Sequence, residues 1–351
     1  MAENRPTVEL RTSPHIRSAP SVDVIMRNVV YALLPVCSFA VYQFGLSALA
    51  LILVTSLACV LTEHLFCRLS AKPTTVGDGS ALISGILLGL TLPPGFPLWM
   101  GAVAGFVGIG LGKVFFGGLG FNVFNPALVG RAFVQAAFPV AITTWTPAFA
   151  TDRFTQFIPS SLTIPFAQPV PVDTWIAQVA PDGFTGATAL ALYKFERITT
   201  DTADLFFGLT AGSAGETSAL LILICGAYLA LRRMMDWRIP AAMLLAAFVT
   251  AALFFLFDGE RFPNPVFVLF SGGLMLGAVF MASDMVASPV TPLGVWVYGG
   301  LIGLVTVIIR FFGGLPEGVM YAILLGNAAS PLIEAATQPR VYGTAKGRPE
   351  G

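Results

Sequence analysis

"SGILLGLTLPPGFP", residues 84–97, begins as an apolar helix and ends in a cluster of prolines and a glycine. The apolar window that contains most of it, 80–93, is too short to cross the roughly 30 Å core of a bilayer as a straight helix. Backbone groups freed at a broken helix end must be satisfied inside protein or beside a cavity. We therefore predict a half-helix whose broken end lines a pocket buried in the protein.

The composition around this stretch indicates an integral membrane protein. Hydrophobic residues make up 56% of the 351 residues and charged residues 11%, against roughly 25% charged in soluble domains. So much apolar surface requires lipid around it, so membrane lipid is an expected partner. Lys and Arg equal Asp and Glu at 19 each, so no nucleic-acid partner is expected. The two histidines, His15 and His64, are far apart, and we predict no metal site.

Ten apolar windows predict an all-α fold of about ten transmembrane helices, some of them broken. They lie at about 24–44, 46–66, 80–93, 98–117, 124–145, 217–233, 239–257, 264–282, 293–312 and 317–336. The predicted organisation is a tail (1–23), a first membrane repeat (24–145), a long loop (146–216), a second membrane repeat (217–336) and a second tail (337–351).

A short internal repeat indicates that the two halves are related. "FFGGL" occurs at 115–119 and again at 311–315. Each copy follows an apolar segment with a Ser-Gly start, at 84–89 and 271–277. With five spans in each half, the two copies fall on opposite sides of the membrane. We therefore predict inverted five-helix repeats, with a site where the repeats meet.

The distribution of basic residues predicts the orientation. With the N-terminus in the cytoplasm, only five of the 19 basic residues fall outside, 13 fall on the cytoplasmic side, and Arg131 lies within a span. The five are Arg153, Lys194, Arg197, Arg261 and Arg310. Positive charge favours the cytoplasmic side. Both termini should therefore be cytoplasmic and the long loop periplasmic.

Two features within the spans have competing interpretations. The run "GAVAGFVGIGLG" at 101–112 superficially resembles a nucleotide-binding loop, but no strand precedes it, and we interpret it as close helix packing. Arg131 lies about two turns into its span. Snorkelling to the cytoplasmic face is the interpretation we favour, with contact to an anionic ligand or pairing with an acid as alternatives.

Acidic side chains in or near the spans are candidates for ion or proton sites, although all of them fall near predicted helix ends. They are Glu63, Asp78, Glu216, Asp284, Glu317 and Glu334.

Asn122 and Asn125 follow a glycine-rich turn, and Asn125 precedes a proline. Helix capping explains that pattern, and binding of the amide edge of a flat heterocycle is the alternative.

The long loop contains two threonines that are surrounded in sequence by small residues. "APDGFTGATAL", residues 180–190, places Thr185 and Thr188 among Gly and Ala, with no His, Lys or Cys beside them. A nucleophilic enzyme needs a neighbouring base, so we predict no catalytic residue here. Gly183, Gly186 and Ala187 leave the hydroxyls accessible, which suits a site that another enzyme modifies, but from the residues alone we favour a turn in an ordinary loop.

This stretch resembles the [ST]GAT flavinylation motif of the RnfD and NqrB membrane subunits, including the preceding Asp182 and Gly183. The resemblance covers nearly the whole chain and is strongest in five further segments. They are "TSPHI" (12–16), "LTLPPGFPLWM" (90–100), "GKVFFGGLGFNVFNPALVGRAF" (112–133), "MASDMVASPVTPLG" (281–294) and "NAASPLIE" (327–334). The short N-terminus is more similar to RnfD than to NqrB.

The resemblance implies a phosphoester-linked FMN on Thr188, within the motif Asp182, Gly183, Thr185, Gly186 and Ala187, attached by a flavin transferase that uses FAD. It also implies a subunit of the Rnf complex in the bacterial inner membrane, beside RnfA, RnfB, RnfC, RnfE and RnfG. That complex passes electrons between ferredoxin and NAD and couples this to Na⁺ or H⁺ translocation.

The resemblance also suggests a second flavin site, and it leaves two alternative functions. NqrB also holds a noncovalent riboflavin at a Gly-x-Asn-x-x-Asn segment, which corresponds here to Gly120, Asn122 and Asn125. The alternatives to an Rnf subunit are an NqrB-type subunit of a Na⁺-translocating NADH:quinone reductase and a urea-channel-like transporter without a redox role. Fold alone does not decide between them.

Overall fold

The computed structural model describes residues 21–71, 74–167, 169, 171–172, 175–176, 187–216 and 218–339. Thr188 and Ala187 are among them, whereas the predicted motif residues Asp182, Gly183, Thr185 and Gly186 lie outside the described residues. Most of both predicted tails also lies outside them.

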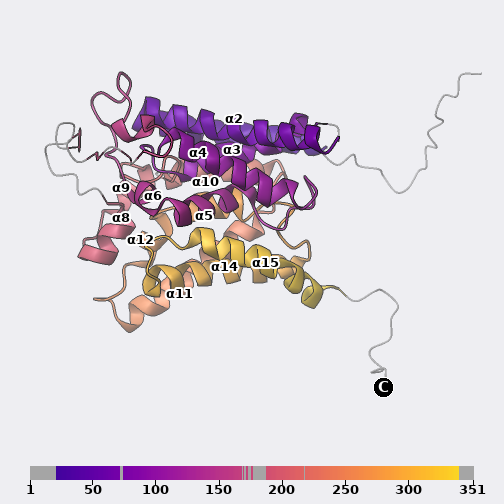
Figure 1. Cartoon of the computed structure of the whole chain (residues 1–351). Helices are drawn as coiled ribbons and strands as arrows, with labels where there is room; N and C mark the ends of the chain where they lie inside the picture. The colour runs from indigo at the N-terminus through magenta and orange to yellow at the C-terminus, as the bar shows by residue number, and fades with distance from the viewer. Residues whose placement is uncertain are drawn as a thin grey trace, which may run out of the picture.

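Helices are the only regular secondary structure among the described residues, which confirms the all-α part of the predicted fold (Figure 1). The first half comprises α1 (Val22–Phe44), α2 (Leu46–Leu69), α3 (Ser80–Thr91), α4 (Leu98–Ile109), its π-helical continuation η2 (Gly110–Val114), α5 (Pro126–Ala137) and α6 (Pro139–Thr143). The loop contributes η3 (Pro159–Leu162), α8 (Ala189–Ala191), η4 (Leu192–Glu196) and α9 (Thr202–Phe207). The second half comprises α10 (Ala219–Leu231), α11 (Arg238–Phe257), α12 (Pro265–Phe270), α13 (Leu274–Leu276), η5 (Gly277–Met281), α14 (Pro292–Phe312) and α15 (Val319–Thr337).

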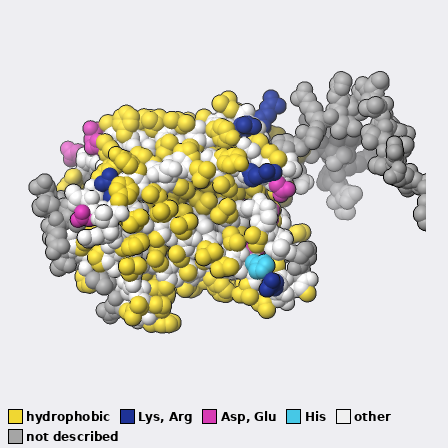
Figure 2. All heavy atoms as spheres, turned by 90° about the horizontal axis from the view of Figure 1, so that it is seen from above, with side chains coloured by type: hydrophobic (Ala, Val, Ile, Leu, Met, Phe, Trp, Pro, Cys, Tyr) yellow, Lys and Arg dark blue, Asp and Glu magenta, His cyan; other side chains and the backbone are white. Residues whose placement is uncertain are grey.

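Five helices among the described residues are long and apolar enough to cross a membrane: α1, α2, α11, α14 and α15. The other predicted windows contain shorter elements. The window 264–282 is interrupted at Ser271, and the window 124–145 divides at Phe138 before a proline. Figure 2 shows hydrophobic side chains across the middle of one face and charged ones toward its two ends, as a membrane belt requires. The count of ten spans stays a prediction.

The half-helix prediction is confirmed by α3, which ends at Thr91 with its last turns buried. Its freed carbonyls are satisfied by protein, because Ala214 N donates to Leu92 O at 3.2 Å and Gly215 N donates to Leu90 O at 2.8 Å. The broken end of α3 therefore fixes the backbone just before Glu216.

The glycine run 101–112 serves helix packing, as predicted. A Cβ on Gly108 would lie 2.6 Å from Pro126 O, so α4 and α5 approach too closely there for any larger residue. A Cβ on Gly130 would lie 2.5 Å from Ala104 O across the same contact.

The two FFGGL copies lie at opposite ends of the bundle (Figure 1). The first follows Lys113, which lines a cavity together with Ile25 and Met26 at the start of α1. The second copy includes the last two residues of α14 and lies at the end that carries α8, where the Lys194 amine donates to the Gly313 carbonyl. This placement is the one that inverted repeats require, and the repeat relationship itself stays a prediction.

Candidate functional site

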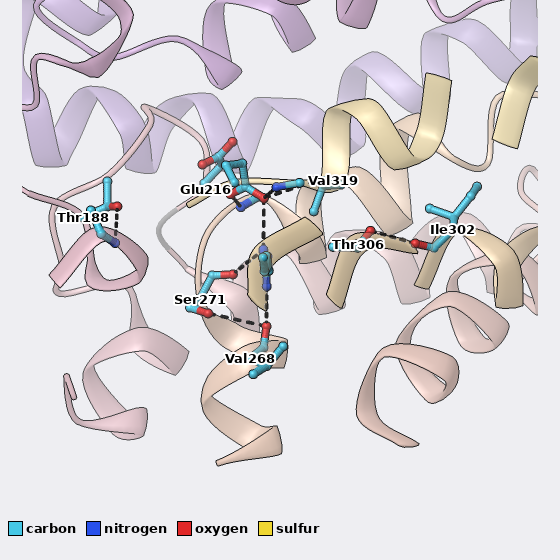
Figure 3. Close-up of polar contacts among 12 residues, drawn as sticks. Thr188, Glu216, Val268, Ser271, Ile302, Thr306 and Val319 are labelled. Carbon is cyan, nitrogen blue, oxygen red and sulfur yellow. Dashed lines mark hydrogen bonds and ion pairs between the residues drawn. The ribbon is translucent and has the colours of Figure 1, made fainter. Parts of the chain in front are cut away.

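Thr188 is the N-cap of α8, the short helix that follows the predicted attachment motif. Its backbone is extended, with φ −76° and ψ 160°, and its Oγ accepts a hydrogen bond from Ala191 N at 3.3 Å (Figure 3). The side chain is half-buried. A capping hydroxyl still has its own proton and one lone pair free, so it remains available for esterification.

Two contacts fix α8 and η4 against the second half. Leu190 packs with Leu205 and Phe267 in a small apolar cluster. Lys194 Nζ donates to three carbonyls, those of Arg310, Gly313 and Leu315, at 3.0, 2.6 and 2.8 Å. Burial lowers the pKa of the Lys194 amine. The threonine therefore stands on a short helix that is firmly attached to the end of α14.

A cavity of about 50 Å³ lies beside Thr188, and we call it the Thr188 cavity. The residues that line it include the aromatic residues Trp145 and Phe270 and the charged residues Arg131, Glu216 and Glu317. The charge of Arg131 is offset by the two carboxylates, and a cavity of this size holds only a few water molecules. A flavin attached to Thr188 would therefore have to lie mainly outside the cavity, with the Thr188 hydroxyl as its point of attachment.

The snorkelling interpretation of Arg131 is wrong. Its Nη1 lies 2.8 Å from Glu216 Oε1, and side-chain exposures of 8% and 7% show that both are buried. Glu216 is 85 residues further along the chain and is held in place by the broken end of α3. Pairing inside the protein removes the need to reach the membrane surface, because a buried charge with a partner is stable there.

A second ion pair, between the buried Arg310 and the partly exposed Glu317, lies next to the first. Arg310 Nη2 donates to Glu317 Oε1 at 3.1 Å, and its guanidinium also donates to the Val268 and Ser271 carbonyls, at 2.7 and 3.0 Å (Figure 3). Those carbonyls are freed where α12 ends at the Ser-Gly-Gly break. Arg310 thus satisfies the backbone at this second broken helix.

The two asparagines lie at the other end of the molecule, beside a cavity of about 100 Å³ that we call the Asn125 cavity. Asn125 caps α5, since its side-chain oxygen accepts from Ala127 N at 3.0 Å and Leu128 N at 3.4 Å. The capping interpretation is therefore confirmed for Asn125. Both Asn122 and Asn125 also line the cavity, and Gly120, with φ 90°, forms the turn before them.

The walls of the Asn125 cavity combine apolar surface with polar groups, which is the kind of lining that the predicted riboflavin site requires. Val279 and Met234 supply apolar surface, and Asp284 and the two amides supply polar groups. Lys113 also lines it, but its Nζ is engaged by Glu63 Oε1 and Ser80 Oγ, each at 2.6 Å. Within the residues that the structure covers, no group of three metal-ligating side chains occurs.

Comparison with known proteins finds similarity over nearly the whole chain. Residues 9–343 match the model of the NQR2, RnfD, RnfE family. The chain is 42% identical over 347 residues to the D subunit of the Na(+)-translocating ferredoxin:NAD(+) oxidoreductase complex of Acetobacterium woodii, with 98% of each chain covered. It is 38% identical to the D subunit of the proton-translocating ferredoxin:NAD(+) oxidoreductase complex of Clostridium ljungdahlii, with 95% and 96% covered. It is 39% identical to the D subunit of the ion-translocating oxidoreductase complex of Stutzerimonas stutzeri, with 94% of each covered.

Proposed function

The chain belongs to the NQR2, RnfD, RnfE family, and we propose that it is the electron-carrying membrane subunit of an ion-translocating ferredoxin:NAD⁺ oxidoreductase. In this proposal FMN is linked covalently to Thr188, and electron passage is coupled to Na⁺ or H⁺ movement. The relatives' names supply the complex and its reaction, and the chain's own residues supply the site.

The observation that carries the proposal is the position of Thr188. Thr188 is half-buried, caps α8, and lines a cavity together with Trp145, Phe270 and the paired Arg131 and Glu216. The flavin, once attached, would supply the electron chemistry. The chain would supply the attachment oxygen of Thr188 and, beside it, the aromatic surface of Trp145 and Phe270.

The proposal is tested by the fluorescence of the denatured chain, because only a covalent flavin stays with the protein in a denaturing gel. We expect a fluorescent band when the chain is produced together with a flavin transferase. The purified chain alone should oxidise no NADH at a sustained rate, since its role requires the other subunits. A dark band would favour a transporter of the same fold, and quinone reduction by the assembled complex would favour the NqrB-type alternative.

We propose a periplasmic position for Thr188, with both termini in the cytoplasm and the chain in the bacterial inner membrane. The support is the 13-to-5 bias of basic residues and the position of α8 at the end of the bundle opposite the end of α15 (Figure 1). A reporter active only in the cytoplasm should be inactive when fused after about residue 160 and active at the C-terminus. A cytoplasmic signal from the loop fusion would contradict this orientation.

A further inference from the structure

Four of the five basic residues assigned to the outer side of the membrane line one cavity. The cavity measures about 160 Å³ and is lined by residues of η4, of α14 and of the segment that joins α11 to α12. We call it the Arg261 cavity. Its basic lining residues are Lys194, Arg197, Arg261 and Arg310, and none of the described residues that line it is acidic. Basic residues are scarce on the outer side of membrane proteins, so their collection at one cavity indicates an anionic ligand.

Three of these positive charges have no carboxylate beside them. Arg310 is already paired with Glu317. The Lys194 amine donates to three carbonyls, which fix its position but do not neutralise its charge. No ion pair in the described part of the chain involves Lys194, Arg197 or Arg261. The acidic residues of the adjoining turns lie outside the cavity lining, and they are Glu196, Asp258 and Glu260.

Arg197 and Arg261 are held in place and still have hydrogen-bond donors to offer. Arg197 Nη1 and Tyr193 OH both donate to the Arg261 carbonyl, at 2.6 and 2.9 Å, so η4 fixes the turn that carries Arg261. Each guanidinium lies 5.6 Å from an aromatic ring centroid, Arg197 over Tyr193 and Arg261 over Phe262. The Arg261 guanidinium donates no hydrogen bond within the described part of the chain. Arginines placed in this way suit a phosphate, which accepts several charge-assisted hydrogen bonds.

Exposed apolar surface adjoins the cavity at the depth where two candidate membrane spans end. Those spans, α11 and α14, end at Phe257 and Phe312, whose side chains are 88% and 57% exposed. Phe262 and Phe311 line the cavity with ring centroids 5.0 Å apart, and Phe254 packs against both, at 5.1 and 5.6 Å. The apolar wall of the cavity therefore continues onto the ends of two spans, a surface that lipid would cover.

We propose that the Arg261 cavity binds the phosphate of an anionic phospholipid, whose acyl chains lie along the exposed ends of α11 and α14. The cavity has room for roughly ten water molecules, which is ample for a phosphate group. Cations without a carboxylate attract a headgroup of net negative charge, and they repel the amine of a zwitterionic one. An acidic protein segment would match the charges but would leave the apolar wall uncovered. The proposal requires no flavin, so it can fail or succeed independently of the proposed function.

The proposal is tested on the full chain, stripped of lipid in detergent and titrated with phosphatidylglycerol, with bound lipid counted by native mass spectrometry. The altered chain carries Arg197→Gln with Arg261→Gln. The matched control carries Arg232→Gln with Arg233→Gln, which removes two exposed charges at the end of α10, outside the cavity. Loss of two charges beside an anionic headgroup should weaken binding of the first lipid about thirtyfold. The control should bind it as tightly as the wild type.

A charge-retaining variant and two further ligands make the result specific. Arg197→Lys with Arg261→Lys keeps both charges and should bind nearly as tightly as the wild type. Phosphatidylcholine has the chains and the phosphate but no net charge, and it should bind much more weakly. Inorganic phosphate lacks the chains and should not displace phosphatidylglycerol at the same concentration. Equal binding of phosphatidylcholine, or displacement by inorganic phosphate, would overturn the assignment of an anionic lipid.

The variants decide the position of the site. Equal affinity of the altered and control chains for phosphatidylglycerol would overturn the proposal and leave an acidic protein segment as the occupant. If the double glutamine variant fails to fold, Arg261→Gln decides alone, because the Arg261 guanidinium makes no hydrogen bond within the described part of the chain. Unchanged affinity in that variant would contradict the proposal, and weakened affinity with an unchanged thermal transition would support it.

Discussion

Replacing Thr188 with valine should abolish the fluorescent band of the denatured chain and electron transfer through the assembled complex. Valine has nearly the shape of threonine but lacks the oxygen to which a phosphoester attaches. The substitution should lower the free energy of unfolding only slightly, by about 0.5–2 kcal/mol for a lost helix cap. The cap bond is only one contact at 3.3 Å, and Lys194 and Leu190 also hold α8 in place. Assembly should therefore be largely intact while the flavin is lost.

Two comparisons make the Thr188 result specific. Thr188→Ser keeps both the hydroxyl and the cap and should retain label, since serine is an equally good N-cap. Thr185→Val should retain some label, because the family motif attaches flavin at the threonine after Gly-Ala, and only Thr188 holds that place. Peptide mass mapping locates the adduct. An adduct on Thr185, or a labelled Thr188→Val chain, would refute the assignment.

The helical segments were predictable from the sequence because lipid imposes length and apolarity on each of them. The window 46–66 became α2, Leu46–Leu69, and the window 293–312 became α14, Pro292–Phe312. The short window 80–93 became the half-helix α3, since its prolines cannot continue a helix. The break at Ser271 was not predicted as an interruption of the window 264–282, although the Ser-Gly-Gly sequence at 271–273 marks it.

The site was predictable only in part. The motif identified Thr188 as a candidate, because attachment depends on local sequence. The partner of Arg131 was not predictable, since Glu216 is 85 residues away and reaches it through backbone contacts to the broken end of α3. The sequence did contain one indication of this pairing. Glu216 and Glu317 lie beside glycine-rich breaks between apolar segments, and acidic residues at such positions are candidates to pair with an arginine inside a span.

Changing the two asparagines should remove a noncovalent flavin from the Asn125 cavity. Asn125 has two roles to separate, because its side-chain oxygen caps α5 while its amide nitrogen contacts Met281 O at a weak 3.4 Å. Asn125→Ser preserves a capping oxygen and deletes the amide, whereas Asn125→Leu deletes both. Asn122→Ala removes the second amide, whose nitrogen makes a similarly weak contact with Phe124 O at 3.4 Å.

If both amides bind the edge of an isoalloxazine ring, Asn122→Ala combined with Asn125→Ser should lose extractable riboflavin while keeping the covalent band. Each lost hydrogen bond is worth about 0.5–1.5 kcal/mol, so binding should weaken about tenfold or more for the pair. Riboflavin is measured by acid extraction and chromatography, and folding by the thermal transition of the purified chain. If only the leucine variant loses riboflavin, and unfolds at a lower temperature, then Asn125 serves as a cap alone. Full riboflavin retention in every variant would reject the Asn125 cavity as a flavin site, because neither amide would then contribute to binding.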